Sequence, residues 1–189
     1  MKYLPVQIDG NNVYADILRR FTSLLIDFLF FIPIFIFFYK FKGSSIEYVL
    51  FVILFLYTLT NAYFVYFHYR FGATPGKFLL KIKVTQPDGS PIGLKQAVLR
   101  SSIELVLYLI LAIAKVMAIF SADTEQYLLA GYVERNHIIA LNYPIWFGTV
   151  KVVSQIWHLS NPILIFLNKR MRTLHDYIGG TVVIYKKFA

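Results

Sequence analysis

Four long apolar runs, separated by polar stretches, dominate the chain. They cover residues 17–39, 46–69, 97–120 and 145–167, and between residues 21 and 39 the only charge is Asp27. An α-helix rises 1.5 Å per residue, so each run is long enough to cross a hydrocarbon core of about 30 Å. The pattern predicts an all-α membrane protein with four transmembrane helices, arranged as a single domain over residues 1–189.

The polar stretches predict smaller elements. Within the insert at residues 70–94, residues 81–85 alternate and precede a turn, which is typical of a small β-hairpin. Residues 181–185 have the composition of a C-terminal strand that could pair with this insert. We expect a tight loop at residues 40–45, and an outer loop with room for a short amphipathic helix at residues 121–143.

Pro33 lies inside the first apolar run. Proline has no amide hydrogen and therefore cannot donate to the carbonyl four residues earlier. We expect a kink in the first helix at this position.

The composition agrees with a membrane location, because 58% of the residues are hydrophobic and only 15% are charged. The chain contains no Cys, which excludes disulfides and thiolate metal sites. A net charge of +9 would suit nucleic acid, but the basic residues flank the apolar runs. We therefore expect the lipid bilayer as a partner, and no nucleic acid.

The distribution of basic residues predicts the orientation. If the N-terminus is inside, only five of the 19 Lys and Arg residues fall on the outer side, namely Lys40, Lys42, Lys115, Arg135 and Lys151. Cytoplasmic segments of membrane proteins carry an excess of Lys and Arg. The other fourteen residues thus place both termini in the cytoplasm.

The first candidate functional residues are Arg20 and Asp27. They are seven residues apart, which puts them within about 20° of one face of a helix. A charge at membrane depth costs about 2.5–3.5 kcal/mol on insertion scales, so such a residue is either paired or used in function. We expect Asp27 to be met by basic partners.

Other motifs give little support to further chemistry. Residues 72–78 resemble a phosphate-binding loop, but one residue is missing between the glycines, and Phe78 stands where Ser or Thr would bind Mg²⁺. We expect the same glycines to lie in a loop, where close packing of helices is irrelevant. The four His residues lack metal-ligand spacing, and no Ser lies in a nucleophile motif. We therefore expect no cofactor, no metal and no enzymatic activity; His175-Asp176 alone is too little for an enzyme acting on lipid.

Three segments together resemble the RDD family, a group of small bacterial and archaeal membrane proteins named for one arginine and two aspartates. The segments are Arg19-Arg20-Phe21 with Asp27, Gly72-Ala73-Thr74-Pro75-Gly76-Lys77 continuing to Arg100, and Arg172-Thr173-Leu174-His175-Asp176 with Gly180. The resemblance covers the chain apart from residues 120–157. It implies a multi-pass protein of the inner (cytoplasmic) membrane of a prokaryote.

The resemblance also implies transport, since at least one member looks like a sodium-proton antiporter. In this hypothesis Asp27 binds a monovalent cation or a proton in turn. The residues expected around it or in the same charge network are Arg20, Arg100, Asp176, Asn61, Glu104, His158 and His175. Four helices make a narrow bundle, so a transporter is expected to be a homo-oligomer or to have other membrane subunits.

The alternative hypothesis is a membrane scaffold or assembly factor that transports nothing. Here Arg20, Asp27, Arg100 and Asp176 form a fixed network that holds the helices, the insert and the tail together. Arginine suits this role because its guanidinium pairs with carboxylates through two hydrogen bonds. The sequence leaves both hypotheses open.

Overall fold

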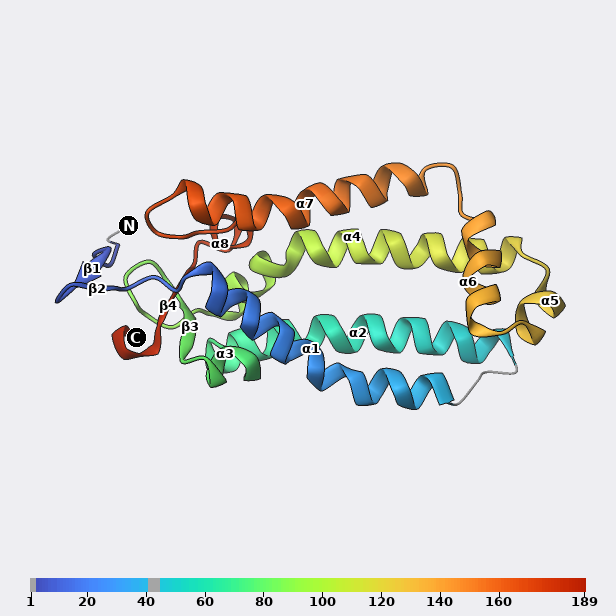
Figure 1. The fold of residues 1–189 in the computed structure, drawn as a ribbon, viewed down its shortest axis with the longest axis horizontal. Coiled ribbons are helices and arrows are strands. Elements are labelled where there is room, and N and C mark those ends of the chain that lie inside the picture. Colours follow the sequence, from blue (N-terminus) through green and yellow to red (C-terminus); the bar gives the residue numbers. More distant parts are fainter. Residues whose placement is uncertain (1–2, 41–44) are drawn as a thin grey trace.

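The computed structural model describes residues 3–40 and 45–189, and it is a helix bundle with a small mixed α/β part at one end (Figure 1). Four helices are long and apolar enough to cross a membrane: α1 (Ile17–Lys40), α2 (Ile46–Phe71), α4 (Leu94–Ser121) and α7 (Phe147–Leu167). They coincide with the four apolar runs. The loop expected at residues 40–45 falls mostly outside the described residues.

Both termini lie at the same end of the bundle (Figure 1), which we call the terminal end. This end also carries β1 (Gln7–Ile8), β2 (Asn11–Asn12), α3 (Pro75–Leu79), β3 (Ile82–Thr85), α8 (Leu174–Ile178), β4 (Val182–Tyr185) and a 3₁₀ turn at Lys186–Phe188. The opposite, distal end carries α5 (Thr124–Leu129) and α6 (Tyr132–Leu141).

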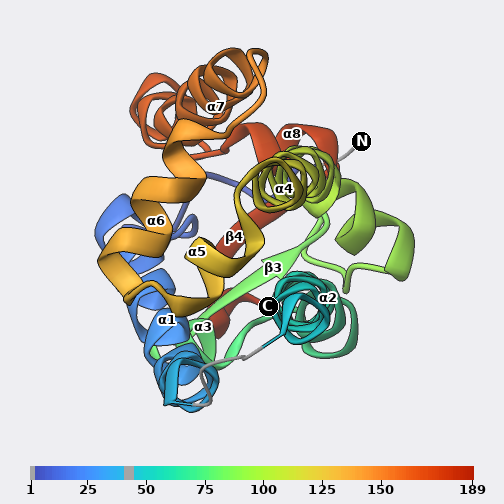
Figure 2. The same cartoon turned by 90° about the vertical axis from the view of Figure 1, so that its right-hand side faces the viewer.

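Helix α4 is central to the bundle, because it packs against α2 and, less extensively, against α7, and it also contacts α8 at the terminal end and α5 and α6 at the distal end. Viewed along the helices, α7, α4 and α2 follow one another from top to bottom, and α1 lies to the left of α2 (Figure 2). Helix α1 packs mainly against the short helix α3. Large apolar side chains on all four long helices remain exposed, as expected of surfaces that lipid covers.

Capping residues and prolines set the ends and bends of the helices. Ser45 caps the start of α2, and Gly72 ends it in a left-handed conformation with φ of 69°. Thr74 and Pro75 then start α3, a helix that the sequence pattern did not predict. Pro33 lies within α1, which changes direction along its length in Figure 1, as expected of an internal proline.

The β-structure differs from the hairpin expected in the insert. Strand β3 pairs antiparallel with β4 from the C-terminal tail, whereas the turn after β3 is closed only by a single bridge between Thr85 and Pro91. The predicted pairing of tail and insert is therefore present, and the predicted hairpin is reduced to this bridge. Four residues of β3 can satisfy their backbone groups on β4, which is also buried, and so the longer pairing wins.

The terminal end has its own apolar core around the β3–β4 ribbon. One face buries Ile82, Val84 and Val183 with residues of the insert and α4, and the other buries Val182 and Ile184 against the N-terminal segment. That segment runs along β4, since Ala15 N donates to Val183 O at 3.0 Å. The N-terminal segment, the insert and the tail thus form one packed unit at the terminal end of the bundle.

The segment expected to be an outer loop is largely helical. Helices α5 and α6 fold across the distal end and bury Tyr127, Ile138 and Ile139 against Ala118 and Ile119 of α4 (Figures 1 and 2). The sequence predicts room for one short amphipathic helix in this segment, whereas the structure has two helices there. We call α5 and α6 the distal cap.

Candidate functional site

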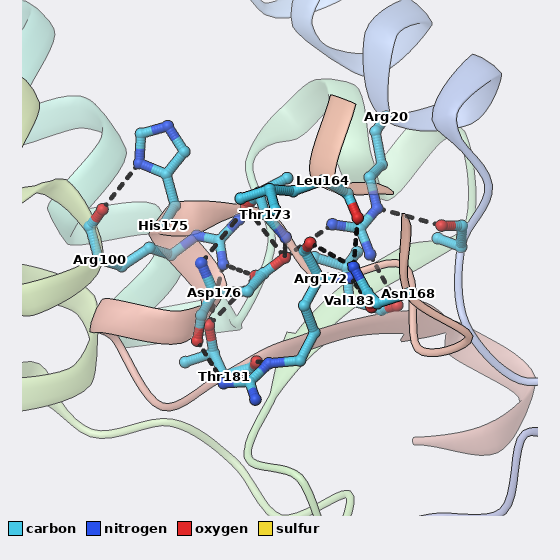
Figure 3. Close-up of polar contacts among 11 residues, drawn as sticks. Arg20, Arg100, Leu164, Asn168, Arg172, Thr173, His175, Asp176, Thr181 and Val183 are labelled. Atoms are coloured by element: carbon cyan, nitrogen blue, oxygen red, sulfur yellow. Dashed lines mark hydrogen bonds and ion pairs between the residues drawn. The ribbon is translucent and has the colours of Figure 1, made fainter. Parts of the chain in front are cut away.

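Asp176 is the centre of the first polar cluster, at the terminal end. Its carboxylate is fully buried and accepts hydrogen bonds from Arg20 Nη1 at 2.8 Å and from Arg100 Nη1 (Figure 3). Thr173 N and Oγ1 donate to the same carboxylate at 3.0 and 3.1 Å, since Thr173 and Asp176 form the capping box of α8. Asp176 therefore joins α1, α4 and α8.

The arginines of this cluster are also bound to backbone carbonyls. Arg20 Nε donates to Ala15 O at 3.1 Å, and Arg172, itself buried, donates to Asp176 O at 2.8 Å and to Thr181 O at 3.1 Å. These bonds fix the guanidinium groups to the N-terminal segment and to the chain around β4. The network therefore links elements from both ends of the sequence.

Asp176 stays ionised in this environment. Burial would raise the pKa of its carboxyl, but the guanidinium groups of Arg100 and Arg20 and the Thr173 amide outweigh burial and hold this pKa well below its usual range. A carboxylate in that state is a permanent anion. It is suited to holding two arginines together and unsuited to exchanging protons.

Asp27 is the centre of a second, separate cluster. Its side chain is 1% exposed, and Oδ1 accepts hydrogen bonds from Tyr63 Oη and from Gly76 N, both at 2.8 Å. Thr74 Oγ1 donates to Oδ2 at 2.5 Å. All three donors are neutral, and they come from α2 and from the start of α3.

The expected pairing of Asp27 with Arg20 is not formed. Within the described residues Asp27 has no ion pair, and both Arg20 and Arg100 are bound to Asp176. Seven residues of helix correspond to about 10.5 Å along the axis, which separates the two side chains although they share a face. Arg20 therefore binds Asp176 near the end of the bundle, and Asp27 binds its neutral donors deeper along α1.

Gly76 allows the loop to approach Asp27 so closely. A Cβ at Gly76 would collide with the backbone oxygen of Ser23 on α1 and would lie 3.0 Å from Asp27 Cγ. The motif that resembles a phosphate-binding loop therefore serves as the contact between α3 and α1. The expectation that its glycines have no role in packing was wrong for Gly76.

A cavity of about 570 Å³ lies inside the bundle, between α1, α2, α4 and α7, and beside the Asp176 cluster. Its polar lining residues are Arg20, Thr60, Asn61, His68, Lys77, Arg100, Ser101, Glu104, Tyr108, His158, Asn161, Thr173 and His175. Asn61, Glu104, His158 and His175, which the sequence analysis grouped around the charge network, all line it. Asp27 and Asp176 do not, so Glu104 is the acidic residue of the described lining.

Glu104 lies between two histidines. Its Oε1 is 3.4 Å from His175 Nε2 and 3.9 Å from His158 Nδ1, and the Tyr108 hydroxyl is 3.4 Å from His158 Nε2. His175 Nδ1 is 3.1 Å from the carbonyl oxygen of Arg100. A carbonyl can only accept, so Nδ1 carries a proton and, in the neutral ring, Nε2 does not.

The contact between Glu104 and His175 therefore needs one shared proton. Without it, an ionised carboxylate oxygen would face the lone pair of Nε2, and the two would repel each other. Burial and the neighbouring Arg100 guanidinium lower the pKa of His175 to about 4, so the ring is neutral at pH 7. A proton taken up at this contact would therefore be carried by Glu104, at the wall of the cavity.

Lys77 and His68 are further residues of this cavity. The Lys77 ammonium group has no hydrogen bond or ion pair to the described residues, and burial, together with the nearby Arg100, lowers the pKa of Lys77 to about 8. His68 is 4% exposed, and within the described chain neither of its ring nitrogens has a partner. Asn161 Oδ1 is likewise buried without a partner there. Polar groups in this state are suited to binding water or a solute.

The sequence analysis assigned no role at the site to several of its residues. Tyr63, Thr74 and Gly76 bind Asp27, and Lys77 and His68 line the cavity, but each owes its role to a neighbour that is distant in the chain. The described residues include no group of three His, Asp or Glu side chains placed to hold a metal ion.

These features define a class of protein. Four helices of membrane length, closed at one end by buried arginine–aspartate contacts, make a small multi-pass membrane protein. The chain belongs to the RDD family, whose model matches residues 14–180 and so includes Arg20, Asp27, Arg100 and Asp176. No curated protein and no solved structure matches the chain.

Proposed function

We propose that this protein exchanges protons for a monovalent cation across the membrane, and that Glu104 is the carboxylate for which the two compete. The observation that carries the proposal is the contact of Glu104 with His175 at the cavity wall, which needs one proton between two acceptors. When that proton leaves, an anionic oxygen faces a solute-sized cavity. Oxygen atoms are the ligands that hard cations prefer, and Asn161, whose buried Oδ1 has no partner among the described residues, lines the same cavity.

Glu104 suits exchange better than Asp27, which the sequence analysis favoured. The Glu104 side chain is 30% exposed and lines the cavity, whereas Asp27 is 1% exposed and already accepts three hydrogen bonds. An ion could reach Asp27 only after at least one of these bonds broke. An ion in the cavity can reach Glu104 without such a step.

The charges around the cavity also favour exchange of one ion for one proton. Three basic side chains, Arg20, Lys77 and Arg100, are matched by Asp176, Asp27 and ionised Glu104. A proton or a monovalent cation on Glu104 changes this balance by the same single positive charge, so the charges of the surroundings do not distinguish the two occupants. Pro162 of α7 lines the cavity and removes one backbone hydrogen bond from that helix, which leaves a carbonyl of the cavity wall without its helical donor.

Reconstitution into vesicles tests the proposal. Vesicles with an acidic lumen and an internal pH reporter receive Na⁺, Li⁺ or K⁺ outside, and we expect one or more of these ions to raise the internal pH in the presence of the wild-type protein. Glu104→Gln keeps the shape of the side chain but cannot ionise, so its exchange should fall at least about tenfold, to the level of empty vesicles. Glu134→Gln, on an exposed position of α6, is the matched control and should exchange as the wild type does.

Asp27→Asn separates the two carboxylates. We expect this variant to unfold at a lower temperature, because an amide has one acceptor oxygen for three donors, at a cost of about 1–3 kcal/mol. The fraction that remains folded should still exchange. Full exchange by folded Glu104→Gln, or loss of exchange in a folded Asp27→Asn protein, would contradict the assignment to Glu104.

A specific observation favours the alternative, a scaffold that transports nothing. Asp27 and Asp176 are both saturated by donors, and together they tie α1 to α2, α3, α4 and α8. Such a protein would give no ion-dependent change of internal pH with any of the three cations. That result would support the scaffold and would leave the network as a purely structural device.

The orientation and the assembly belong to the same proposal. Lys115, Arg135 and Lys151 lie in the distal half of the bundle, and most other basic residues lie toward the terminal end, which supports a cytoplasmic terminal end in the inner membrane of a prokaryote. Accessibility of a single cysteine, introduced at Asp9 or at Glu134, to an impermeant reagent on intact cells tests the orientation. The homo-oligomer, or a complex with other membrane subunits, stays a prediction that the mass of the purified protein tests.

A further inference from the structure

A second cavity, of about 590 Å³, lies at the distal end, between α1, α2, α4 and the distal cap. We call it the distal groove. Its lining residues are Phe35, Ile36, Phe38, Tyr48, Val49, Val52, Ile53, Leu56, Lys115, Tyr127, Ala130, Tyr132, Arg135, Asn136 and Ile139. It shares no lining residue with the cavity around Glu104, and so a ligand here is independent of the proposed exchange.

One side of the distal groove is an apolar wall. Val49, Val52, Ile53 and Leu56 recur at the spacing of a single helix face and line the groove along two turns of α2. Ile36 on α1 is 49% exposed and also lines the groove, so the wall continues into the surface that lipid covers. This wall has the length and the chemistry of a seat for a hydrocarbon chain.

The other side of the groove is cationic. Lys115 and Arg135 line it, and the described lining residues include no Asp or Glu. Lys115 is six residues before the end of α4, about 9 Å below that end, and its ammonium group has no hydrogen bond or ion pair to the described residues. A charge at such a depth is unfavourable unless something pairs with it.

Neighbouring polar groups extend this cationic side. Arg135 donates to the carbonyls of Ala130 and Leu128, which hold its guanidinium in place without neutralising it. The Tyr48 hydroxyl is buried in the groove wall and has no partner within residues 3–40 and 45–189. The groove therefore offers two positive charges and a free hydroxyl beside an apolar wall.

We propose that the distal groove binds one anionic phospholipid, with its phosphate at Lys115 and Arg135 and an acyl chain along the α1–α2 wall. Charge complementarity identifies the headgroup, because the described lining of the groove holds two cations and no carboxylate, and an anion would pair with them. Continuity with the lipid-facing surface identifies the chain. The exposed Tyr132 and Val133 at the start of α6 agree with a cap that lies at the membrane interface.

Lipid binding to the purified full-length protein tests the proposal. Native mass spectrometry would compare phosphatidylglycerol with phosphatidylcholine of the same acyl chains, and thermal unfolding would be measured with each lipid. We expect one phosphatidylglycerol per chain and a higher unfolding midpoint with this lipid. Lys115→Met keeps the apolar stem and should weaken binding of phosphatidylglycerol about tenfold, whereas Lys151→Met, an exposed lysine near the start of α7, should not.

A second pair of variants keeps the test decisive if Lys115→Met folds poorly. Val52→Trp fills the groove and should abolish the bound phosphatidylglycerol, whereas Leu54→Trp, on an exposed face of the same helix, should leave it unchanged. Equal binding of both lipids, or retained binding of phosphatidylglycerol by folded Lys115→Met or Val52→Trp, would overturn the proposal. So would stabilisation by inorganic phosphate as large as that by the lipid, because the acyl chain would then contribute nothing.

Discussion

The backbone amide of Gly76 donates a hydrogen bond to Asp27 Oδ1 at 2.8 Å, and this contact depends on the missing side chain of the glycine. The start of α3 thereby packs against α1 at the depth of a buried carboxylate. The polar insert is held to the bundle by this contact, and the same short segment supplies Thr74 as a second donor.

We predict that Gly76→Ala destabilises the protein by about 1–3 kcal/mol, because the added methyl group would displace either α1 or α3. Thermal unfolding in detergent measures the change. Gly148→Ala in α7 is the matched control: apart from its own stretch of helix, the described residues place no atom within 4 Å of its added Cβ, so its midpoint should stay the same or rise slightly. An unchanged midpoint for Gly76→Ala would mean that the contact contributes little.

The four long helices could be predicted from sequence because each one contains an apolar run of membrane length, a property of the segment alone. The terminal end was harder. Residues 82–85 have the composition of a strand, but the local sequence does not show which segment pairs with it. The candidates are the residues just after the nearby turn and β4, which lies about 100 residues further along the chain. Tertiary burial decided between the two partners.

The charged residues show the same limit. Arg20 and Asp176, both singled out from sequence, meet across 156 positions of the chain. Helical periodicity placed Arg20 and Asp27 on one face but says nothing of their partners, and Asp27 took its donors from Tyr63, Thr74 and Gly76. Glu104, His158 and His175 were identified as polar residues in or near apolar runs, yet only the packing of α4, α7 and α8 shows that they share one cavity.

Removal of the Asp176 charge is expected to be more damaging than removal of any exposed acidic charge. Asp176→Asn leaves the buried Arg20 and Arg100 guanidinium groups without their anion, and we predict a loss of about 3–5 kcal/mol. Asp88→Asn, at an exposed turn position, should change the free energy of unfolding by less than about 0.5 kcal/mol. The two variants are compared by thermal unfolding.

A double-mutant cycle gives this prediction a further check. If Arg20 and Asp176 stabilise each other, Arg20→Met combined with Asp176→Asn should cost less than the two single changes added together. Strict additivity would show that the 2.8 Å contact between these side chains contributes no coupling energy.

The last prediction concerns acid. The pKa of His175 is about 4 in the folded protein because of burial and the nearby Arg100, against 6.5 as its ordinary value. Between these values the unfolded chain binds the proton that the folded chain refuses, so stability rises with pH from about 4 to 6.5 and is lost as the pH falls through this window. We expect His175 to contribute about 2–3 kcal/mol to the change in the free energy of unfolding across this window.

His175→Asn should flatten the slope, since the amide of Asn can still donate to the Arg100 carbonyl but cannot bind a proton. The measurement is the free energy of unfolding of wild type and variant from pH 4 to pH 7. Glu104, His158, Arg100 and Asp176 surround the ring, and the difference between the two proteins separates the His175 contribution from titration of these groups. His137→Asn, at an exposed position of α6, is the control and should keep the wild-type slope. An unchanged slope in His175→Asn would show that the buried ring is not the group that couples folding to pH in this window.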